Sequence, residues 1–375
     1  MNLTECREKI DSIDSQIVSL YEERMDVCKE IAADKILNGK KVFDQEREKE
    51  KIEKVTSQAH NDFNRLGIAE LFEQIMSMSR KLQYCLLNEK GVKGRIPFVE
   101  VDDIRKSPNR VVFQGIEGSY SQEAMFAFFG KDVKGFCVDT FKDAMSAIAE
   151  GAADYGVLPI ENSSAGIVSE NYDLLVEYEN YIVGEQIIDI NHCLLGLNEA
   201  REEDIKTVYS HPQALMQCAE YLDGHRKMEA ISTNNTAMAA RMIRDENDST
   251  KAAIASINAA ERYGLSVIKQ GIQTSDGNST RFMIVTNQKV YMKGADKVSI
   301  CFEIPHRSGS LYHILSNFIY NNINMNKIES RPMKDRPWEY RFFIDFDGRL
   351  SDNGVRNALL GIREETTNMK ILGNY

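Results

Sequence analysis

Apolar residues near the start of the chain recur at alternating intervals of three and four, which predicts a long helix packed along one stripe. The stripe consists of Leu3, Cys6, Ile10, Ile13, Ile17, Leu20, Val27 and Ile31. Arg24 occupies the one position of this stripe that carries a charge. Because an unpaired guanidinium on a packed stripe is costly to desolvate, we expect Arg24 to meet an anion. Lys35 lies eleven residues further on and points the same way, since eleven residues turn about 20° past three full turns.

The rest of the first 90 residues continues the helical pattern without a proline. Asp44 is a plausible cap for a second helix, which would place Arg47 and Glu48 on one face. A third helix repeats the stripe with Ser79 at a packed position and Gln83 one turn later. Three helices with polar groups on their inward stripes do not close a core alone. We therefore expect an intertwined dimer in which the first helix spans both halves.

Two further segments follow, separated by stretches at 91–109 and 287–296 that break the periodicity and are expected to be linkers. In the middle segment, short apolar runs alternate with helical stretches, which predicts an α/β domain with largely parallel strands. The runs are Val111 to Phe113, Tyr155 to Ile160, Thr207 to Tyr209, Ala252 to Ala255 and Phe282 to Val285. The last segment has the order strand, helix, strand, strand, helix, strand, which is the ferredoxin-like α+β arrangement.

Composition limits what such a chain binds. Hydrophobic residues make up 42% and charged residues 27%, as in soluble globular proteins, and the net charge is -11. This charge argues against a general nucleic-acid or membrane surface, so an anion site has to be local. The seven cysteines and six histidines show no metal-binding spacing. We expect reduced thiols, no metal or organic cofactor, and a cytoplasmic location, since there is neither an export signal nor an 18-residue apolar run.

Taken singly, each polar residue of the helical segment fits a solvated helix face. Taken together, the cations with Glu48, Ser79 and Gln83 describe a site for a small dianion that carries hydroxyl and ether oxygens. The set contains no nucleophile and no titrating histidine, so it can only bind, orient and stabilise charge. Arg7 lies about 100° around the helix from Arg24, so we expect it to serve the partner's site.

This segment resembles the helical chorismate mutase of the fused chorismate mutase/prephenate dehydratase enzymes. The similar stretches are CREKIDSID, YEERM, ADK, FDQEREKE and MSRKLQ. The resemblance implies that Lys35 and Gln83 are catalytic, bonding the ether oxygen of chorismate, and that Glu48 binds its C4 hydroxyl. The substrate-binding residues it implies are Arg7, Arg24, Lys35, Asp44, Arg47, Glu48, Ser79 and Gln83.

The middle segment contains GIEGSYSQEA at 115–124, PIENSSAG at 159–166, SHPQAL at 210–215 and TRF at 280–282. Singly, these motifs also fit turns, helix starts and, for Glu161, a buried structural acid. In this order they resemble prephenate dehydratase, which implies two periplasmic-binding-protein-like α/β lobes with the active site between them. Thr280 would then be catalytic, donating to the departing hydroxyl oxygen. The binding residues implied are Ser119, Glu161, Asn162, Ser163, Gln213, Thr280 and Arg281.

The last segment contains RSGSL at 307–311 and KIESRP at 327–332. A turn glycine and an edge-strand proline account for each motif singly. As a pair they resemble the phenylalanine-binding motifs of the ACT regulatory domain. The allosteric residues implied are Gly309, Ser310, Leu311, Glu329, Ser330, Arg331 and Pro332.

We thus expect a chorismate mutase domain at 1–90, a linker at 91–109, a prephenate dehydratase domain at 110–288 and an ACT domain at 297–375. The chain would convert chorismate to prephenate and then to phenylpyruvate, as a homodimer or higher homo-oligomer inhibited by L-phenylalanine. Two alternatives stay open: an amino-acid-binding sensor, or the same enzyme with only the dehydratase active. A sensor would have no need for the helical cations or for Thr280 in TRF.

Overall fold

The computed structural model describes residues 2–90, 96–106, 109–275, 277–305, 309–333 and 336–375. Its backbone divides into two compact units. One comprises Met1–Pro97 with Ile300–Met369, and the other comprises Phe98–Ser299 with Lys370–Tyr375. Within the described ranges, no helix combines the length and the apolar character needed to cross a bilayer.

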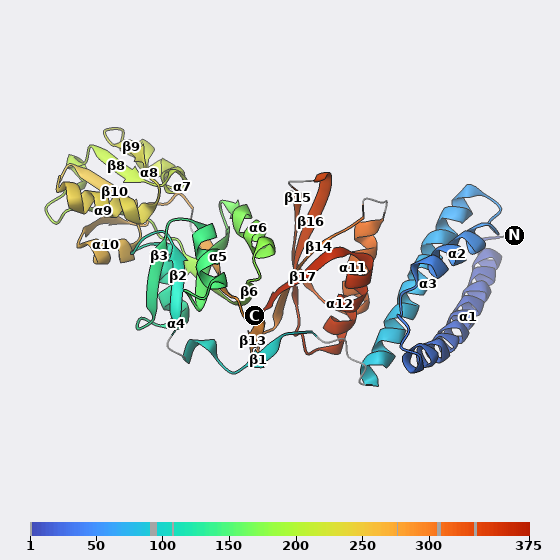
Figure 1. Cartoon of the computed structure of the whole chain (residues 1–375). Coiled ribbons are helices and arrows are strands. Elements are labelled where there is room, and N and C mark those ends of the chain that lie inside the picture. Colours follow the sequence, from blue (N-terminus) through green and yellow to red (C-terminus); the bar gives the residue numbers. More distant parts are fainter. Residues whose placement is uncertain (1, 91–95, 107–108, 276, 306–308, 334–335) are drawn as a thin grey trace. The chain divides into compact units, whose positions relative to one another are not determined.

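The described part of the helical segment, from residue 2 to residue 90, forms three helices, as predicted (Figure 1). They are α1 (Leu3–Leu37), α2 (Gln45–Thr56) and α3 (Asp62–Glu89). Asp44 caps α2, which confirms its expected role. The buried side chains of α1 are Cys28 and Ala32, both in its second half. By contrast, the apolar stripe is 43% to 64% exposed at Ile10, Ile13, Ile17, Leu20, Val27 and Ile31.

The C-terminal segment has the predicted βαββαβ order. Its elements are β14 (Lys297–Glu303), α11 (Ser310–Tyr320), β15 (Met325–Met333), β16 (Arg336–Asp347), α12 (Asn353–Glu365) and β17 (Thr367–Asn374). The strands are ordered β15-β16-β14-β17. Pro332 lies on β15, at the end of this order, where a residue without an N–H is tolerated. Arg307 and Ser308 of the RSGSL motif lie outside the described residues.

The second unit contains two α/β lobes, each with its own sheet. The first lobe has the strand order β6-β12-β4-β2-β3, with β5 (Gly166–Ile167) paired to β4. It is built from β2 (Arg110–Gln114), α4 (Tyr120–Phe129), β3 (Lys134–Val138), α5 (Phe141–Ala149), β4 (Tyr155–Asn162), α6 (Ser169–Glu177), β6 (Tyr181–Asp189) and β12 (Ser279–Thr286).

The second lobe has the strand order β11-β7-β10-β8-β9. It is built from β7 (Cys193–Gly196), η2 (Glu202–Asp204), β8 (Thr207–Ser210), α7 (Pro212–Gln217), α8 (Ala219–Gly224), β9 (Glu229–Ser232), α9 (Thr236–Glu246), β10 (Lys251–Ala255), α10 (Ile257–Tyr263) and β11 (Ser266–Gln270). The chain passes between the lobes twice, after β6 and after β11.

The prediction of largely parallel strands is only half right. β2 is parallel to β3 and β4, and β8 is parallel to β9 and β10. The strands next to the two crossovers are antiparallel: β12 to β4 and β6, and β7 to β10 and β11. β7 and β12 are the first strands after the two crossovers, and each runs opposite to its neighbours because the chain enters that sheet from the side of the other lobe. The hydrophobic pattern of a strand carries no information about its direction.

The two segments expected to be linkers contain strands that pair with each other. β1 (Val99–Val101) and β13 (Val290–Met292) form a parallel two-stranded sheet, and η1 (Ile104–Lys106) follows β1. Ile104 is buried in the core of the first lobe, and Val290 packs against the same core. Strands of three residues are too short to produce a readable alternation, so the periodicity could not indicate them.

Candidate functional sites

The structure brings Arg24 of α1 and Ser79 of α3 together. The Arg24 guanidinium donates to Ser79 Oγ at 2.5 Å, and the Ser79 hydroxyl donates to the carbonyl of Ile75 at 2.8 Å. Ser79 is only 5% exposed. In the described parts of the chain, no carboxylate forms an ion pair with Arg24. The cation predicted to need an anion is therefore held by a neutral hydroxyl.

Gln83 and Lys35 also lie where a polar ligand could meet them. Gln83 is one turn beyond Ser79 on α3 and is 6% exposed. Its Oε1 atom is buried and has no hydrogen-bond partner among the described residues. Lys35 is half-buried, and its ammonium donates to the carbonyl of Val42 at 2.6 Å. A buried amide oxygen without a partner is rare, so the Gln83 side chain is suited to a ligand.

Three other predicted mutase residues are not directed into this interior within one chain. Arg7 is exposed on α1. The Asp44 carboxylate accepts from the backbone N–H of Arg47 at 3.1 Å and is thus engaged in capping α2. The Arg47 side chain is 75% exposed and lies 3.6 Å from the carboxylate of Glu50. The prediction that Arg47 shares an inward face with its neighbours is not met in the single chain.

Glu48 pairs with Arg80, a cation that the sequence analysis missed. Both side chains are largely buried, with 24% exposed for Glu48 and 12% for Arg80. The guanidinium also lies 5.1 Å from the centre of the Phe43 ring. Because α2 and α3 are brought together only by folding, no local pattern signals this pair.

In the second unit, Thr280 and Asn162 face each other across β12 and β4. Asn162 Nδ2 donates to Thr280 Oγ1 at 2.9 Å, and Thr280 is 8% exposed. The other end of the amide is held by the turn after β4, where Asn162 Oδ1 accepts from the backbone N–H groups of Ser164 and Ala165 at 3.0 and 2.9 Å. Among the described side chains, Thr280 Oγ1 donates to none.

Glu161 and Arg281 lie on the opposite face of the same two strands, because neighbouring residues of a strand point to opposite sides. They are register partners, and Arg281 Nη2 lies 2.9 Å from the Glu161 carboxylate. Arg281 also lies 3.4 Å from the Glu185 carboxylate. Glu161 is 37% exposed, so the alternative of a buried structural acid is wrong. The structure thus separates this ion pair from Thr280 and Asn162.

A cleft of about 650 Å³ lies between the lobes. Its lining residues are Gln114, Gly115, Ile116 and Asp139 from the first lobe and His211, Pro212, Thr233, Asn234, Asn235 and Met238 from the second. Two predicted binding residues lie beside these segments: Ser119 caps α4, and Gln213 is in the first turn of α7. Burial lowers the pKa of His211, whose Nδ1 accepts from the Gln213 N–H at 3.2 Å.

Four polar residues that hydrogen bonds link to Asn162 directly or through one another were not predicted as site residues: His192, Gln217, Asn278 and Ser164, the last of which lies within the PIENSSAG motif. Asn278 is 6% exposed, and its Oδ1 accepts from Asn162 at 2.8 Å. Its Nδ2 has no partner among the described residues. Gln217 lies one turn after Gln213 on α7, which is the one sequence signal that could have indicated it. The predicted Ser163 accepts from the backbone N–H of Ser279 at 3.0 Å.

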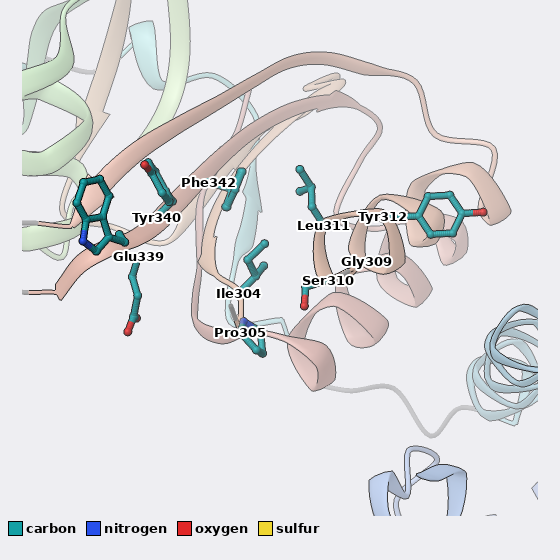
Figure 2. A pocket seen from close by; sticks show the side chains of 10 residues that line it. Ile304, Pro305, Gly309, Ser310, Leu311, Tyr312, Glu339, Tyr340 and Phe342 are labelled. Carbon is teal, nitrogen blue, oxygen red and sulfur yellow. The ribbon is translucent and has the colours of Figure 1, made fainter. Parts of the chain in front are cut away.

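The C-terminal segment contains a cavity of about 220 Å³ (Figure 2). Gly309, Ser310 and Leu311, at the start of α11, line it together with Ile304 beyond β14 and Phe342 of β16. The ring of Tyr312 points away from β16 in Figure 2. The other predicted effector residues, Glu329, Ser330, Arg331 and Pro332, lie on β15 and are not among its lining residues.

Comparison with known proteins decides the family. A chorismate mutase type II model matches residues 6–84 and a prephenate dehydratase model matches residues 111–290. A bifunctional chorismate mutase/prephenate dehydratase from Stutzerimonas stutzeri is 33% identical over 375 residues, which cover 98% of this chain and 96% of that protein. The chain belongs to the bifunctional chorismate mutase/prephenate dehydratase family. It is an enzyme with both activities and acts in phenylalanine biosynthesis.

Two further relatives each match about 71% of the chain. Arogenate dehydratase 1 from Petunia hybrida is 38% identical over 285 residues, covering 71% of this chain and 66% of that protein. The crystal structure of a prephenate dehydratase from Arthrobacter aurescens in complex with L-Phe is 28% identical, with a TM-score of 0.66, and covers 71% of this chain and 89% of that one.

Proposed function

We propose that the helical domain rearranges chorismate to prephenate, and that the two-lobed domain converts prephenate to phenylpyruvate, carbon dioxide and water. The observation that carries the residue assignment is the contact between Asn162 and Thr280, in which the threonine oxygen accepts and its proton stays available. The domain division at 1–90, 110–288 and 297–375 is part of this proposal.

In the mutase domain, Arg24 would bind a carboxylate of chorismate in addition to the Ser79 hydroxyl. Lys35 and the buried Gln83 would contact the ether oxygen as its bond breaks. The rearrangement is unimolecular and transfers no proton to the protein. Catalysis then consists of holding the reactive conformation and stabilising charge, which is what cations and amides can supply.

The exposed apolar stripe of α1 supports a dimer in which the first helix lies against the partner. Isoleucines at helical spacing with about half of their surface exposed are favourable only if another surface covers them. Arg7 is exposed on the same helix and would complete the partner's site. Ile17→Asp should give monomers in sedimentation velocity and lose mutase activity, whereas the exposed Ser12→Asp on the same helix should do neither.

In the dehydratase, the bond from the ring to the departing carboxylate breaks and its electrons make the ring aromatic. The C4 hydroxyl leaves with its bonding electrons and takes up one proton to become water. Hydroxide is a poor leaving group, so a donor at this oxygen accelerates the reaction. Thr280 would be that donor, through a hydrogen bond to the leaving oxygen, while the proton that completes the water molecule comes from solvent and not from the threonine. Ser119 and the N–H groups at the start of α4 would receive a carboxylate of prephenate.

Arg281 and Glu161 would support the catalytic strand from its other face. The sequence predicted that both residues bind substrate, but their ion pair with each other favours a supporting role instead.

L-Phenylalanine would occupy the 220 Å³ cavity at the start of α11, within an ACT domain. Glu329 and Pro332 of β15 would contribute to this site from a second copy of the chain.

A cytoplasmic location is supported by the seven cysteines, which are all free thiols.

One experiment tests the assignment: chorismate consumption and phenylpyruvate formation are followed in the wild type, Thr280→Ala and Arg24→Ala. Thr280→Ala should accumulate prephenate, and Arg24→Ala should lose the first step while still dehydrating added prephenate. Unimpaired dehydration by Thr280→Ala would reject the dehydratase assignment. Arogenate is assayed in parallel, because the Petunia relative is named for that substrate.

A further inference from the structure

A continuous series of hydrogen bonds leads to Thr280 from a buried histidine. Its links are His192 Nε2 to Gln217 Oε1 at 2.9 Å, Gln217 Nε2 to Ser164 Oγ at 2.6 Å, Ser164 Oγ to Asn162 Oδ1 at 2.8 Å, and Asn162 Nδ2 to Thr280 Oγ1 at 2.9 Å. His192 is 2% exposed. All four distances are those of ordinary or strong hydrogen bonds.

The direction of donation along this series follows from the backbone. Two backbone N–H groups point at Asn162 Oδ1, so this atom is the amide oxygen. The Ser164 hydroxyl therefore donates to it, and has no second proton to give to Gln217. Gln217 must donate to Ser164 through its nitrogen, which turns its oxygen toward His192. His192 Nε2 then carries a proton.

Both crossovers between the lobes meet at His192. It lies between β6 and β7, its backbone N–H donates to Gln273 Oε1 at 3.1 Å, and its carbonyl accepts from the Ile272 N–H at 3.2 Å. Its Nδ1 lies 3.3 Å from the hydroxyl of Tyr120 on α4. Burial lowers the pKa of His192, so the ring is neutral and Nδ1 is free to accept.

Gln217 is the member of the series that comes from the second lobe, through α7. Ser164, Asn162 and Thr280 all belong to the first lobe. The series is therefore complete only while α7 lies against the turn after β4. Opening the lobes would remove Gln217 and with it the connection between His192 and Ser164.

We propose that Gln217 and His192 are positioning residues of the dehydratase, which orient the Thr280 hydroxyl through Ser164 and Asn162 when the lobes are together. Each donor in the series strengthens the next, so the proton of Thr280 is directed outward toward the leaving oxygen. The series does not conduct protons, because two of its links are amides. This inference rests on the proposed role of Thr280 in dehydration.

The test compares steady-state dehydratase kinetics of Gln217→Met, which keeps the length of the side chain but makes no such bonds, with Met216→Gln as a control. Met216 is the preceding residue of α7 and is 62% exposed. Gln217→Met should lower kcat about tenfold or more and leave KM within about threefold. Mutase activity of the same chain should not change, which shows that the enzyme is correctly quantified. A cooperative thermal unfolding transition well above the assay temperature shows that the second unit is folded.

Two further variants separate positioning from a structural role. His192→Gln can still present an N–H to Gln217 and should retain more activity than His192→Leu. Gln217→Glu keeps the acceptor for His192 but loses the donor for Ser164, and its carboxylate should raise the pKa of His192. A new ionisation should then appear in the kcat profile between about pH 6 and 8. Gln217→Met should add nothing in an Asn162→Ala background.

A wild-type kcat in Gln217→Met would overturn the proposal. A rise in KM alone would also overturn it, because Gln217 would then bind substrate directly, and so would equal activities of His192→Gln and His192→Leu. If the wild type itself fails to dehydrate prephenate while the mutase is active, the proposed function fails. That result is distinguishable from a failure of the positioning role.

Discussion

Asn162→Asp should impair dehydration more than removal of the side chain does. The substitution replaces a donor by an acceptor and leaves the shape unchanged. Asn162 Nδ2 donates to Thr280 Oγ1 at 2.9 Å and to Asn278 Oδ1 at 2.8 Å. In the aspartate variant an oxygen would face both of these oxygens. Thr280 would then turn its proton toward the carboxylate and away from the leaving hydroxyl.

The magnitude follows from these contacts and from a third, between Asn162 Nδ2 and the Ser279 carbonyl at 3.2 Å. Each lost N–H···O bond costs about 1 kcal/mol, whereas the Asn278 oxygen still accepts from Ser164 Oγ at 3.3 Å. The sum of about 3 kcal/mol is less than the free energy of unfolding of a typical domain, which is about 5–15 kcal/mol, so the unit should still fold. Loss of the Thr280 donor at the leaving oxygen should lower kcat about 10²- to 10⁴-fold.

The assay is phenylpyruvate formation from prephenate, with chorismate consumption by the same chain as the internal control and thermal unfolding as the measure of stability. Asn162→Ala is the matched comparison, because it removes the amide but offers no acceptor that could capture the Thr280 proton. It should therefore stay more active than Asn162→Asp. An aspartate variant that equals or exceeds the alanine variant would refute this reasoning.

Three further outcomes are expected. Gly118→Ala should destabilise the second unit by about 1–3 kcal/mol, because Gly118 has φ +84° and an added Cβ would lie 3.1 Å from Ala259 Cα of the other lobe. Urea unfolding measures this change, and an unchanged midpoint of the urea unfolding curve would count against it. Because burial lowers the pKa of His192 in the folded state, the unfolded state binds the proton at a higher pH than the folded state does. The neutral, buried His192 therefore adds its full share of stability above about pH 7, and this share is lost progressively as the pH falls below about 6.5. Urea unfolding of His192→Gln at several pH values should lack this part of the pH dependence. Gly309→Ala should weaken the binding of L-phenylalanine measured by calorimetry, because Gly309 lines the cavity with φ +79°, a conformation that alanine rarely adopts. An undiminished heat of binding in this variant would exclude Gly309 from the effector site.

The types of element were readable from the chain because each depends on neighbours a few residues away. The three-four stripe predicted α1, Asp44 predicted the start of α2, and the βαββαβ order of the last segment was correct. Motif order was enough to indicate the family, and the similarity over nearly the whole chain confirms it. Strand direction and the paired strands β1 and β13 were missed, because hydrophobic periodicity records neither.

The contacts of the candidate sites depended on the tertiary structure. Thr280 and Asn162 are 118 residues apart and meet because β12 and β4 are neighbours in register. Because successive side chains of a strand point to opposite faces of the sheet, Arg281 lies on the face opposite to Thr280, although the two residues are adjacent in the sequence. The sequence by itself determined which side chains are present and which local elements carry them. Only the folded chain decided which of them face one another, since register, strand order and the meeting of two lobes are set by contacts between distant segments.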